Sequence, residues 1–321
     1  MNQLPVTYSV ICIDVLMNRV IPQFKIENPI HCQFWCQGLN DTYKVTTAKE
    51  IFILRVYRHN WRTRSEISFE IDALLHLQAN GSDVAYPIKT QTGEYIADLI
   101  APEGMRHAVL TRYADGSELN FSIPESAQIY AKHMAQLHLN STQFNSLHQR
   151  FQLDVQHLIT EPLQRIKPFL KERQDDWNFI ENYAQLLAKK LQTALNHSPQ
   201  LVLCHGDLHG GNAHKNSQLL VSFDFDCCAL GLRSYDLAVF KWALEVDNKS
   251  PQIWENFLHY YQLHFPLPAE EIALIDTLVS IRHIWLIGLH IDIAVAKGWL
   301  NGKYFDQKIA FLRKQQLTTK G

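Results

Sequence analysis

The stretch HGDLHGGN at residues 205–212 restricts the fold and chemistry of this chain more than any other feature. A short apolar run, 201–204, precedes it, and a second apolar run, 219–223, is followed by the sequence DFD at Asp224 to Asp226. Both runs have the length and composition of buried strands. Asp207 stands five residues before Asn212, and Asp224 follows twelve residues after Asn212. The spacing therefore predicts that two carboxylates and one amide meet at a single site.

Phosphoryl transfer requires this set of side chains. One carboxylate orients the acceptor hydroxyl and takes its proton, while an asparagine and a second carboxylate hold Mg²⁺ over the phosphates. By this reasoning Asp207 is the catalytic base, and Asn212 and Asp224 are the metal ligands. Glycines at 206, 210 and 211 allow the tight backbone path that such a loop needs.

The first third of the chain carries the signals of a small antiparallel sheet. Its β-branched and aromatic runs are separated by connections short enough for hairpins. One helix is predicted between them, because apolar residues recur at helical spacing before an Asn-Gly stop. We predict strands at 29–36, 41–47, 51–58, 84–88 and 107–116, and a helix at 65–81. These elements form an expected N-terminal domain, 1–113, which ends at a hinge near 113–116.

The second part of the chain, 114–321, is expected to be a mainly helical domain. Apolar residues recur at i, i+3 and i+4 in six segments, and the strand–loop–strand unit around Asp207 lies between them. The predicted helices are 126–139, 175–197, 235–246, 252–264, 269–297 and 304–317. A sheet domain followed by a helical domain gives the fold class α+β.

Composition narrows the range of partners and compartments. Thirty basic and 32 acidic residues give a net charge of -2 without blocks of like charge, so neither a nucleic-acid surface nor a polybasic membrane anchor is indicated. The apolar stretch 272–296 contains charged residues and is expected to be a buried helix rather than a membrane span. The six cysteines lack the paired spacing of a zinc site, and we interpret them as reduced, which favours a cytoplasmic location.

The chain resembles the aminoglycoside phosphotransferase and choline kinase family, whose fold is similar to that of protein kinases. The family's catalytic loop H-G-D-x-x-x-x-N, its metal loop with an aspartate, an aromatic residue and an acidic residue, and its G-x-x-x-[YF]-D-L-A tail match HGDLHGGN, SFDFD and GLRSYDLA in order. The resemblance extends over residues 30 to 240. It implies a two-lobed α+β fold with a small antiparallel β-sheet lobe and a larger helical lobe, and it implies kinase activity with ATP and Mg²⁺.

The same resemblance assigns further site residues. GLNDTYKV (38–45) looks like the turn that covers the phosphates, FILRVYR (52–58) like the third strand, and VLTRYADG (109–116) like the hinge. The family position that is commonly lysine is Arg55 here. The residues that the resemblance places at ATP are Gly38, Asn40, Arg55, Glu70, Arg112 and Tyr113, and those that it places in support of the catalytic loop are His205 and Asp236.

The function expected from these observations is an ATP- and Mg²⁺-dependent phosphotransferase that moves the γ-phosphate to a hydroxyl of a small metabolite. The acceptor could be an amino alcohol, an amino acid, a sugar or an aminoglycoside, and no partner other than this small molecule is expected. Two alternatives stay open: a protein Ser/Thr kinase of the same family, and an inactive nucleotide-binding module, which Arg55 motivates. A phosphatase is disfavoured, because Cys228 stands where the D-x-D-x nucleophile strand expects Thr or Val.

Overall fold

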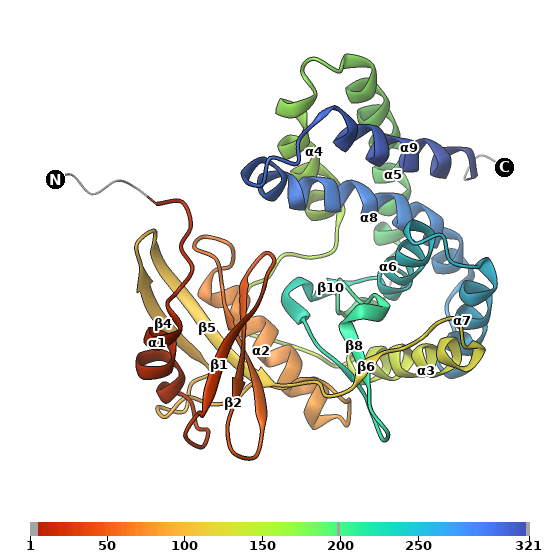
Figure 1. Cartoon of the computed structure of the whole chain (residues 1–321). Helices are drawn as coiled ribbons and strands as arrows, with labels where there is room; N and C mark the ends of the chain where they lie inside the picture. Colours follow the sequence, from red (N-terminus) through yellow and green to blue (C-terminus); the bar gives the residue numbers. More distant parts are fainter. Residues whose placement is uncertain (1–5, 198–199, 319–321) are drawn as a thin grey trace. The chain divides into compact units, whose positions relative to one another are not determined.

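The computed structural model describes residues 6–197 and 200–318, which form two compact units (Figure 1). Unit 1 comprises Met1–Ser117, Phe144–Arg150 and Ala213–Asp226, and unit 2 comprises Glu118–Gln143, Phe151–Asn212 and Cys227–Gly321. The chain therefore leaves unit 2 after Asn212 and returns to it after Asp226. Two of the predicted site residues, Asp207 and Asn212, belong to unit 2, whereas Asp224 belongs to unit 1.

Unit 1 is built on a five-stranded antiparallel sheet in the order β1-β2-β3-β5-β4. Side chains of β2 and β3 alternate between buried and partly buried positions, because successive residues of a strand point to opposite faces. The strands are β1 (His31–Gln37), β2 (Asp41–Thr46), β3 (Ile51–Val56), β4 (Ile96–Ala101) and β5 (Gly104–Arg112).

Two different segments cover the two faces of this sheet. The N-terminal turns α1 (Ile13–Val15), η1 (Leu16–Val20) and η2 (Ile21–Gln23) bury their apolar residues against one face. Helix α2 (Arg64–Ala79) packs against the other face, where Ile67 and Ile71 contact Val109. The second face is also the one that carries Arg55, so α2 brings its own polar residues to the candidate nucleotide site.

Helix α2 begins at a capping box. The side chain of Thr63 accepts a hydrogen bond from the main-chain N–H of Glu66, and the side chain of Glu66 accepts one from the N–H of Thr63 at 2.8 Å. Such a box satisfies two N–H groups that a helix start otherwise leaves without a partner. The box fixes the register of α2 and therefore the position of Glu70 one turn later.

Unit 2 is a helical assembly around α8, which packs against α4, α5 and α6. At position 288 of α8 the chain has glycine, and a Cβ there would lie 2.6 Å from Cα of Pro162, so the close contact with α4 requires glycine. The helices and short turns of unit 2 are α3 (Pro124–Asn140), η3 (Gln156–Thr160), α4 (Glu161–Ile166), η4 (Lys167–Leu170), α5 (Gln174–Asn196), η5 (Gly210–Asn212), α6 (Arg233–Val246), α7 (Pro251–His264), α8 (Ala269–Ala296) and α9 (Gly302–Thr318).

Short strands frame the candidate catalytic loop. In unit 2, β7 (Val202–Cys204) pairs with β10 (Ala229–Gly231), and in unit 1, β8 (Ala213–Lys215) pairs with β9 (Leu220–Ser222), both antiparallel. The short strand β6 (Ser117–Glu118) marks the point at which the chain leaves unit 1, and the turn η6 (Phe225–Cys227) marks its return to unit 2.

Most predicted elements are confirmed, and the exceptions have local causes. Segment 84–88 was expected as a strand, which is wrong: it forms only isolated bridges, with Ala85 bonded to Ser222 and Ile88 to Leu110, and Pro87 between them has no N–H to donate. Strand β4 was not predicted from the sequence, because its side chains do not alternate between buried and exposed positions. The short helical segments between residues 156 and 170 were also not predicted. They contain Pro162 and Pro168, which interrupt the helical periodicity of the sequence.

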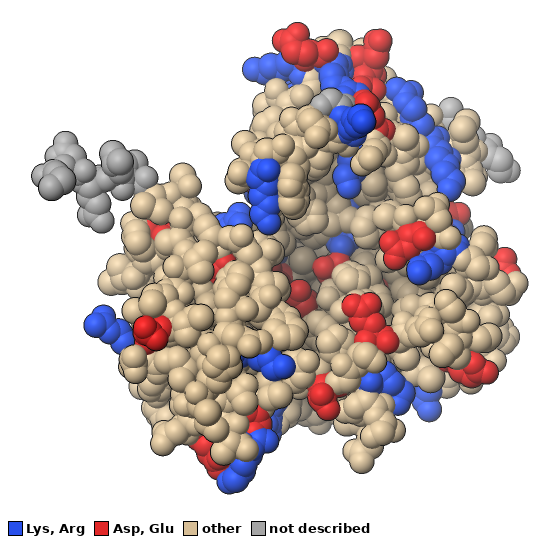
Figure 2. Space-filling model, viewed as in Figure 1, with Lys and Arg blue, Asp and Glu red and all other residues tan. Residues whose placement is uncertain are grey.

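Helix α8 is also, among the described residues, the one helix that is long and apolar enough to cross a membrane. Of its most apolar window, 78% is buried inside the structure, as in the core helix of a folded unit. On the face shown in Figure 2, lysine and arginine side chains are interspersed with aspartate and glutamate, and neither sign forms a continuous patch.

Candidate active site

The main chain of the catalytic loop is held by a buried carboxylate. Asp236, in the first turn of α6, accepts hydrogen bonds from the N–H of His205 at 2.7 Å and of Gly206 at 2.8 Å. Burial disfavours the charged form of Asp236, but hydrogen bonding from His138, at 3.0 Å, holds the pKa of this carboxyl below its usual value. His138 in turn bonds to the hydroxyl of Tyr261 at 2.8 Å. This chain of contacts keeps the loop in one conformation.

Glycine is required at position 206. Its φ of +79° lies in the left-handed region, and a Cβ at this position would lie 2.1 Å from the carbonyl oxygen of Cys227. No other residue type fits such a close approach of two main-chain segments without displacing one of them. The glycine of HGD is therefore structural, and it turns the next residue, Asp207, away from β7.

Asp207 is fixed at its main chain and partly open at its side chain. Its N–H donates to Nδ1 of His205 at 3.2 Å, and its carbonyl oxygen accepts from Nδ2 of Asn212 at 2.8 Å. Its carboxylate is 25% exposed and bonds through Oδ1 to the guanidinium of Arg282. No described residue donates a hydrogen bond to Oδ2. One carboxylate oxygen is thus anchored, and the other has no hydrogen-bond donor among the described residues.

Asn212 uses only one end of its amide. Nδ2 donates to the carbonyl of Asp207, and within the described residues Oδ1 accepts no hydrogen bond although the side chain is buried. An amide oxygen is a ligand that Mg²⁺ accepts. Among the described residues, no group of three or more His, Cys, Asp or Glu side chains is placed to hold a metal ion. The amide oxygen of Asn212 in unit 2 and the carboxylate of Asp224 in unit 1 are each of a donor type that suits Mg²⁺.

Unit 1 contains a cavity of about 170 Å³ between the sheet, α2 and the segment 214–225. Apolar and aromatic side chains form most of its wall, as in many nucleotide and small-molecule sites. Four predicted ATP residues line it, namely Arg55, Glu70, Arg112 and Tyr113, and so does Asp224. Trp35, Ile53 and Phe223 contribute apolar surface.

Arg55 bridges two carboxylates in this cavity. Nη1 lies 2.6 Å from Oε1 of Glu70 on α2, and Nη2 lies 2.6 Å from Oδ1 of Asp224. Burial alone would lower the pKa of Arg55, but the charges of Glu70 and Asp224 outweigh it and raise that pKa well above its ordinary value. Tyr57 donates its hydroxyl to Oε2 of Glu70 at 2.8 Å. Arg55 therefore pairs with Glu70 of α2 and with Asp224 at the same time.

Asp224 has an unusual backbone conformation. Its φ is +66°, which a residue other than glycine rarely adopts. Strained φ values of this kind persist where surrounding contacts fix them, and they concentrate at functional sites. The conformation directs the Asp224 carboxylate toward Arg55.

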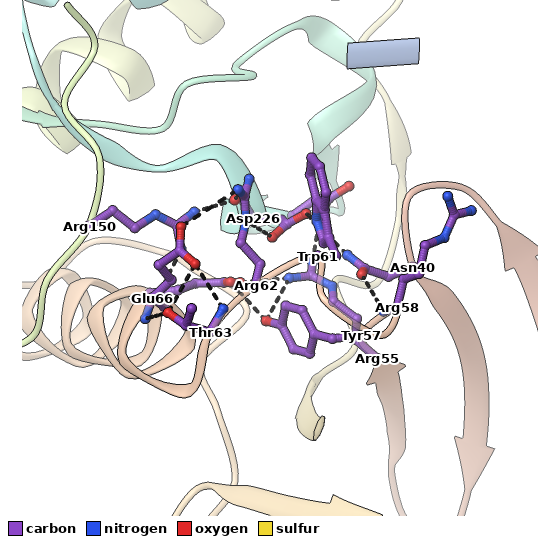
Figure 3. Close-up of polar contacts among 12 residues, drawn as sticks. Asn40, Arg55, Tyr57, Arg58, Trp61, Arg62, Thr63, Glu66, Arg150 and Asp226 are labelled. Carbon is purple, nitrogen blue, oxygen red and sulfur yellow. Dashed lines mark hydrogen bonds and ion pairs between the residues drawn. The ribbon is translucent and has the colours of Figure 1, made fainter. Parts of the chain in front are cut away.

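Asp226, two residues later, is the centre of a buried polar cluster in unit 1 (Figure 3). Oδ2 accepts from Nε1 of Trp61 at 2.9 Å and from Nδ2 of Asn40 at 3.1 Å, and Oδ1 accepts from Nε of Arg62 at 3.1 Å. Its carbonyl oxygen accepts from Arg62 at 2.9 Å and from Arg150. Burial alone would raise the pKa of Asp226, but the guanidinium groups around it hold that pKa well below the usual range.

The residues expected at the phosphate turn are placed differently from each other. Asn40 is buried, and its side chain bonds to Asp226 and to the N–H of Arg58. Gly38 donates its N–H to the carbonyl of Asn40 at 3.0 Å, and a Cβ there would meet nothing within 4 Å. Neither residue lines the cavity that contains Arg55. Their contact with ATP remains a prediction, as does a cation shared by Asn212 and Asp224.

Two functional contacts escaped the sequence reasoning. Arg282 reaches Asp207 from α8, and Asp226 collects partners from three separate segments of unit 1. Asp226 is the last residue of the DFD motif, so the sequence contained a signal from which a role for Asp226 could have been predicted. Nothing in the apolar pattern of α8 distinguished Arg282 from a charge at the surface.

The geometry can be compared with known proteins. Residues 36–272 match the model of the Phosphotransferase enzyme family. The chain belongs to this family. The prediction of a kinase-type phosphotransferase related to aminoglycoside phosphotransferases and choline kinases is thereby confirmed. Among curated proteins, an uncharacterised protein of Synechocystis is 31% identical over 314 residues, which are 97% of this chain and 87% of the relative.

Two solved structures have folds similar to that of this chain. The amicoumacin kinase hAmiN, solved with AMP-PNP, Ca²⁺ and Ami, has a TM-score of 0.75 at 18% identity and covers 93% of this chain and 90% of its own. A microcompartment-associated aminopropanol kinase has a TM-score of 0.75 at 19% identity and covers 95% of each chain. The predicted α+β, protein-kinase-like fold is confirmed.

Proposed function

We propose that this phosphotransferase uses ATP and Mg²⁺ to phosphorylate a hydroxyl group of a small metabolite. ATP would occupy the cavity of unit 1, with Arg55 beside the phosphates and Tyr113 near the base. Two proteins of similar structure, an amicoumacin kinase and an aminopropanol kinase, support a small-molecule acceptor. A cytoplasmic location is part of the same proposal.

The observation that carries this proposal is the state of Asp207. Its main chain is fixed by Asn212 and His205, one carboxylate oxygen is anchored by Arg282, and the side chain is 25% exposed. A general base needs this combination, because it must meet the acceptor hydroxyl in a defined position. The acceptor oxygen would form a bond to the γ-phosphorus, the bond to the β–γ bridging oxygen would break, and the hydroxyl proton would pass to Oδ2.

We propose Asn212 and Asp224 as the metal ligands, from their positions in the two motifs. When bound, Mg²⁺ neutralises the negative charge that develops on the phosphate oxygens. The guanidinium of Arg55, held by Glu70 and Asp224, would supply a second positive charge on the nucleotide side. Positioning and electrostatics together then account for the rate, as in other phosphoryl transfers.

A screen for phosphate transfer tests the proposal. Pools of amino alcohols, amino acids, sugars and aminoglycosides would be incubated with γ-labelled ATP, Mg²⁺ and either the wild-type protein or Asp207→Asn. We expect label in one pool with the wild type and a loss of about a hundredfold or more with the variant. Asp176→Asn is the matched control, since this carboxylate of unit 2 is similarly exposed, at 20%, and pairs with Arg173.

The outcomes separate the alternatives. Label on a protein substrate and on no metabolite would indicate a protein kinase. ATP binding without transfer to any acceptor would favour an inactive nucleotide-binding module. Equal activity of Asp207→Asn and the wild type would rule out Asp207 as the base.

A further inference from the structure

We propose that Arg282 is a positioning residue that holds the carboxylate of Asp207 for proton transfer. This inference rests on the proposed function, because it assigns a task to a residue that acts through the candidate base. Arg282 lies on α8, 75 positions beyond Asp207 in the sequence. It lies outside the matched region 36–272.

The two arms of the guanidinium contact the loop at consecutive residues. Nη2 bonds to Oδ1 of Asp207, and Nη1 donates to the carbonyl oxygen of Gly206 at 3.2 Å. Asp236 already holds the N–H of Gly206 from α6. The loop is thus gripped from two helices, α6 at its N–H groups and α8 at its carbonyl and carboxylate. Rotation of the Asp207 side chain about its χ angles would break the contact with Arg282.

Arg282 itself is immobilised. Its side chain is 2% exposed, and its guanidinium carbon lies 4.7 Å from the ring centre of Trp285 and 5.6 Å from that of Trp242. Both indoles are anchored, since Nε1 of Trp285 donates to His157 at 3.2 Å and Nε1 of Trp242 donates to His283 at 3.0 Å. Stacked, anchored aromatics fix the plane of a guanidinium. The fork therefore presents a fixed template to Asp207.

Stability does not explain this ion pair. Removing two charges from water costs free energy that their attraction barely recovers, so buried pairs contribute little net stability. Pre-organisation of a reacting group is a different gain, because a displacement of about 1 Å can reduce a rate by roughly a hundredfold. The contact leaves Oδ2 of Asp207 open, which is what a base held at one oxygen requires.

Steady-state kinetics on the full-length protein test the proposal. In Arg282→Met the apolar stem stays between the two indoles while the fork is lost, and we expect kcat to fall by about tenfold to a hundredfold. KM for ATP should stay unchanged, and KM for the acceptor should change little, because the loss concerns the base and not binding. A large rise in the acceptor KM at constant kcat would overturn the proposal and assign Arg282 to acceptor binding.

A double variant isolates the path through Asp207. If Arg282 acts only by holding this carboxylate, Arg282→Met should cause no further loss of kcat in an Asp207→Asn background. Multiplied losses would overturn the proposal. Arg313→Met is the control, because Arg313 also lies in unit 2, stacks on Phe179 at 4.2 Å, pairs with the carboxylate of Asp176 and has no contact with Asp207. Its kcat per folded molecule should match the wild type.

Chemical rescue distinguishes positioning from a merely structural role. Arg282→Ala leaves space for a free guanidinium ion, so guanidinium chloride well below denaturing concentrations should raise its kcat severalfold. Sodium chloride at equal concentration should not. Arg282→Lys keeps the charge but loses the fork, and its kcat should lie between those of the wild type and Arg282→Met. Failure of both guanidinium and lysine to restore rate would overturn the proposal.

A second measurement works without any acceptor. Amide hydrogen exchange of the loop, residues 204–212, should be faster in Arg282→Met than in the wild type and unchanged in Arg313→Met. A wild-type protein that phosphorylates no acceptor would sink the proposed function and leave this measurement intact. Unchanged loop exchange in Arg282→Met would sink the positioning role whatever the activity.

Discussion

Nη2 of Arg55 lies 2.6 Å from Oδ1 of Asp224, so Arg55 contacts the proposed metal ligand directly. Its other arm is equally close to Glu70. A lysine has one point of charge and cannot reach both carboxylates with a planar fork. Arginine at this position thus couples the helix glutamate to the metal loop within unit 1.

The first prediction concerns this coupling. Arg55→Lys should lose one of the two charge-assisted bonds that hold the cation in the cavity, and the less firmly positioned charge should weaken the binding of a non-hydrolysable ATP analogue by about tenfold, or about 1.4 kcal/mol. Calorimetric titration without acceptor measures the change. Arg64→Lys is the control, because Arg64 pairs with Asp98 in unit 1 away from the cavity. Tighter binding by Arg55→Lys would show that arginine weakens nucleotide binding.

The second prediction concerns the Asp226 cluster. Asp226→Ala removes the shared acceptor of Trp61 and Arg62 and leaves the buried guanidinium of Arg62 without its carboxylate. Breaking a buried pair in this way costs about 3–5 kcal/mol of unfolding free energy. Denaturant unfolding measures it, with Asp98→Ala as a half-exposed control that should lose at most about 1 kcal/mol. Equal losses in the two variants would contradict the cluster's structural role.

The third prediction is a pH dependence that originates at His283. Burial, followed by the charge of Lys308, lowers the pKa of His283 from 6.5 to about 3. The neutral ring accepts from Trp242 through Nδ1 and donates to the carbonyl of Lys308 through Nε2, so protonation would break the first bond.

Below pH 6.5 the unfolded chain therefore binds a proton that the folded chain excludes. The unfolding free energy should fall as pH decreases from about 6 to 4, by up to about 1.4 kcal/mol per pH unit from this residue. His283→Gln, compared with wild type over this range by denaturant titration, should be less stable at pH 7 and should show a shallower slope. An unchanged slope would indicate that other groups cause the acid sensitivity.

The fourth prediction tests the contact between α8 and α4. Gly288→Ala would place Cβ 2.6 Å from Cα of Pro162, a main-chain atom that cannot move aside as a flexible side chain does. Such overpacking costs about 1–3 kcal/mol even though alanine favours helices more than glycine does. Thermal unfolding measures the loss. A higher melting temperature would mean that helix propensity outweighs packing here.

Much of the fold was predictable because local patterns determine it. The alternation in β2 and β3 and the capping residues of α2 are readable from adjacent letters. The prediction of a strand at 84–88 was wrong because the hydrogen bonds of this segment go to two different strands, and no local sequence pattern determines these partners. The N-terminal turns escaped prediction because each is too short to show a period.

The residues of the candidate site also divide into those that the sequence predicted and those that it did not. Asp207, Asn212 and Asp236 lie on motifs whose spacing is visible, and the structure shows them joined by the loop's hydrogen bonds in unit 2. Arg282 and Arg150 reach their partners across 75 and 76 positions, through helix packing and a returning segment. Side chains that arrive in this way depend on the folded arrangement, so their roles could not be read from spacing.

Because Arg282 lies beyond the matched region, a shortened protein that ends at residue 272 would retain every recognisable motif letter and lose one of the two grips on its catalytic loop. Because unit 2 is assembled around α8, expression boundaries drawn around the matched region would keep every motif residue and remove the core helix of this unit together with Arg282. For this architecture, the choice of where a fragment stops is a choice about chemistry.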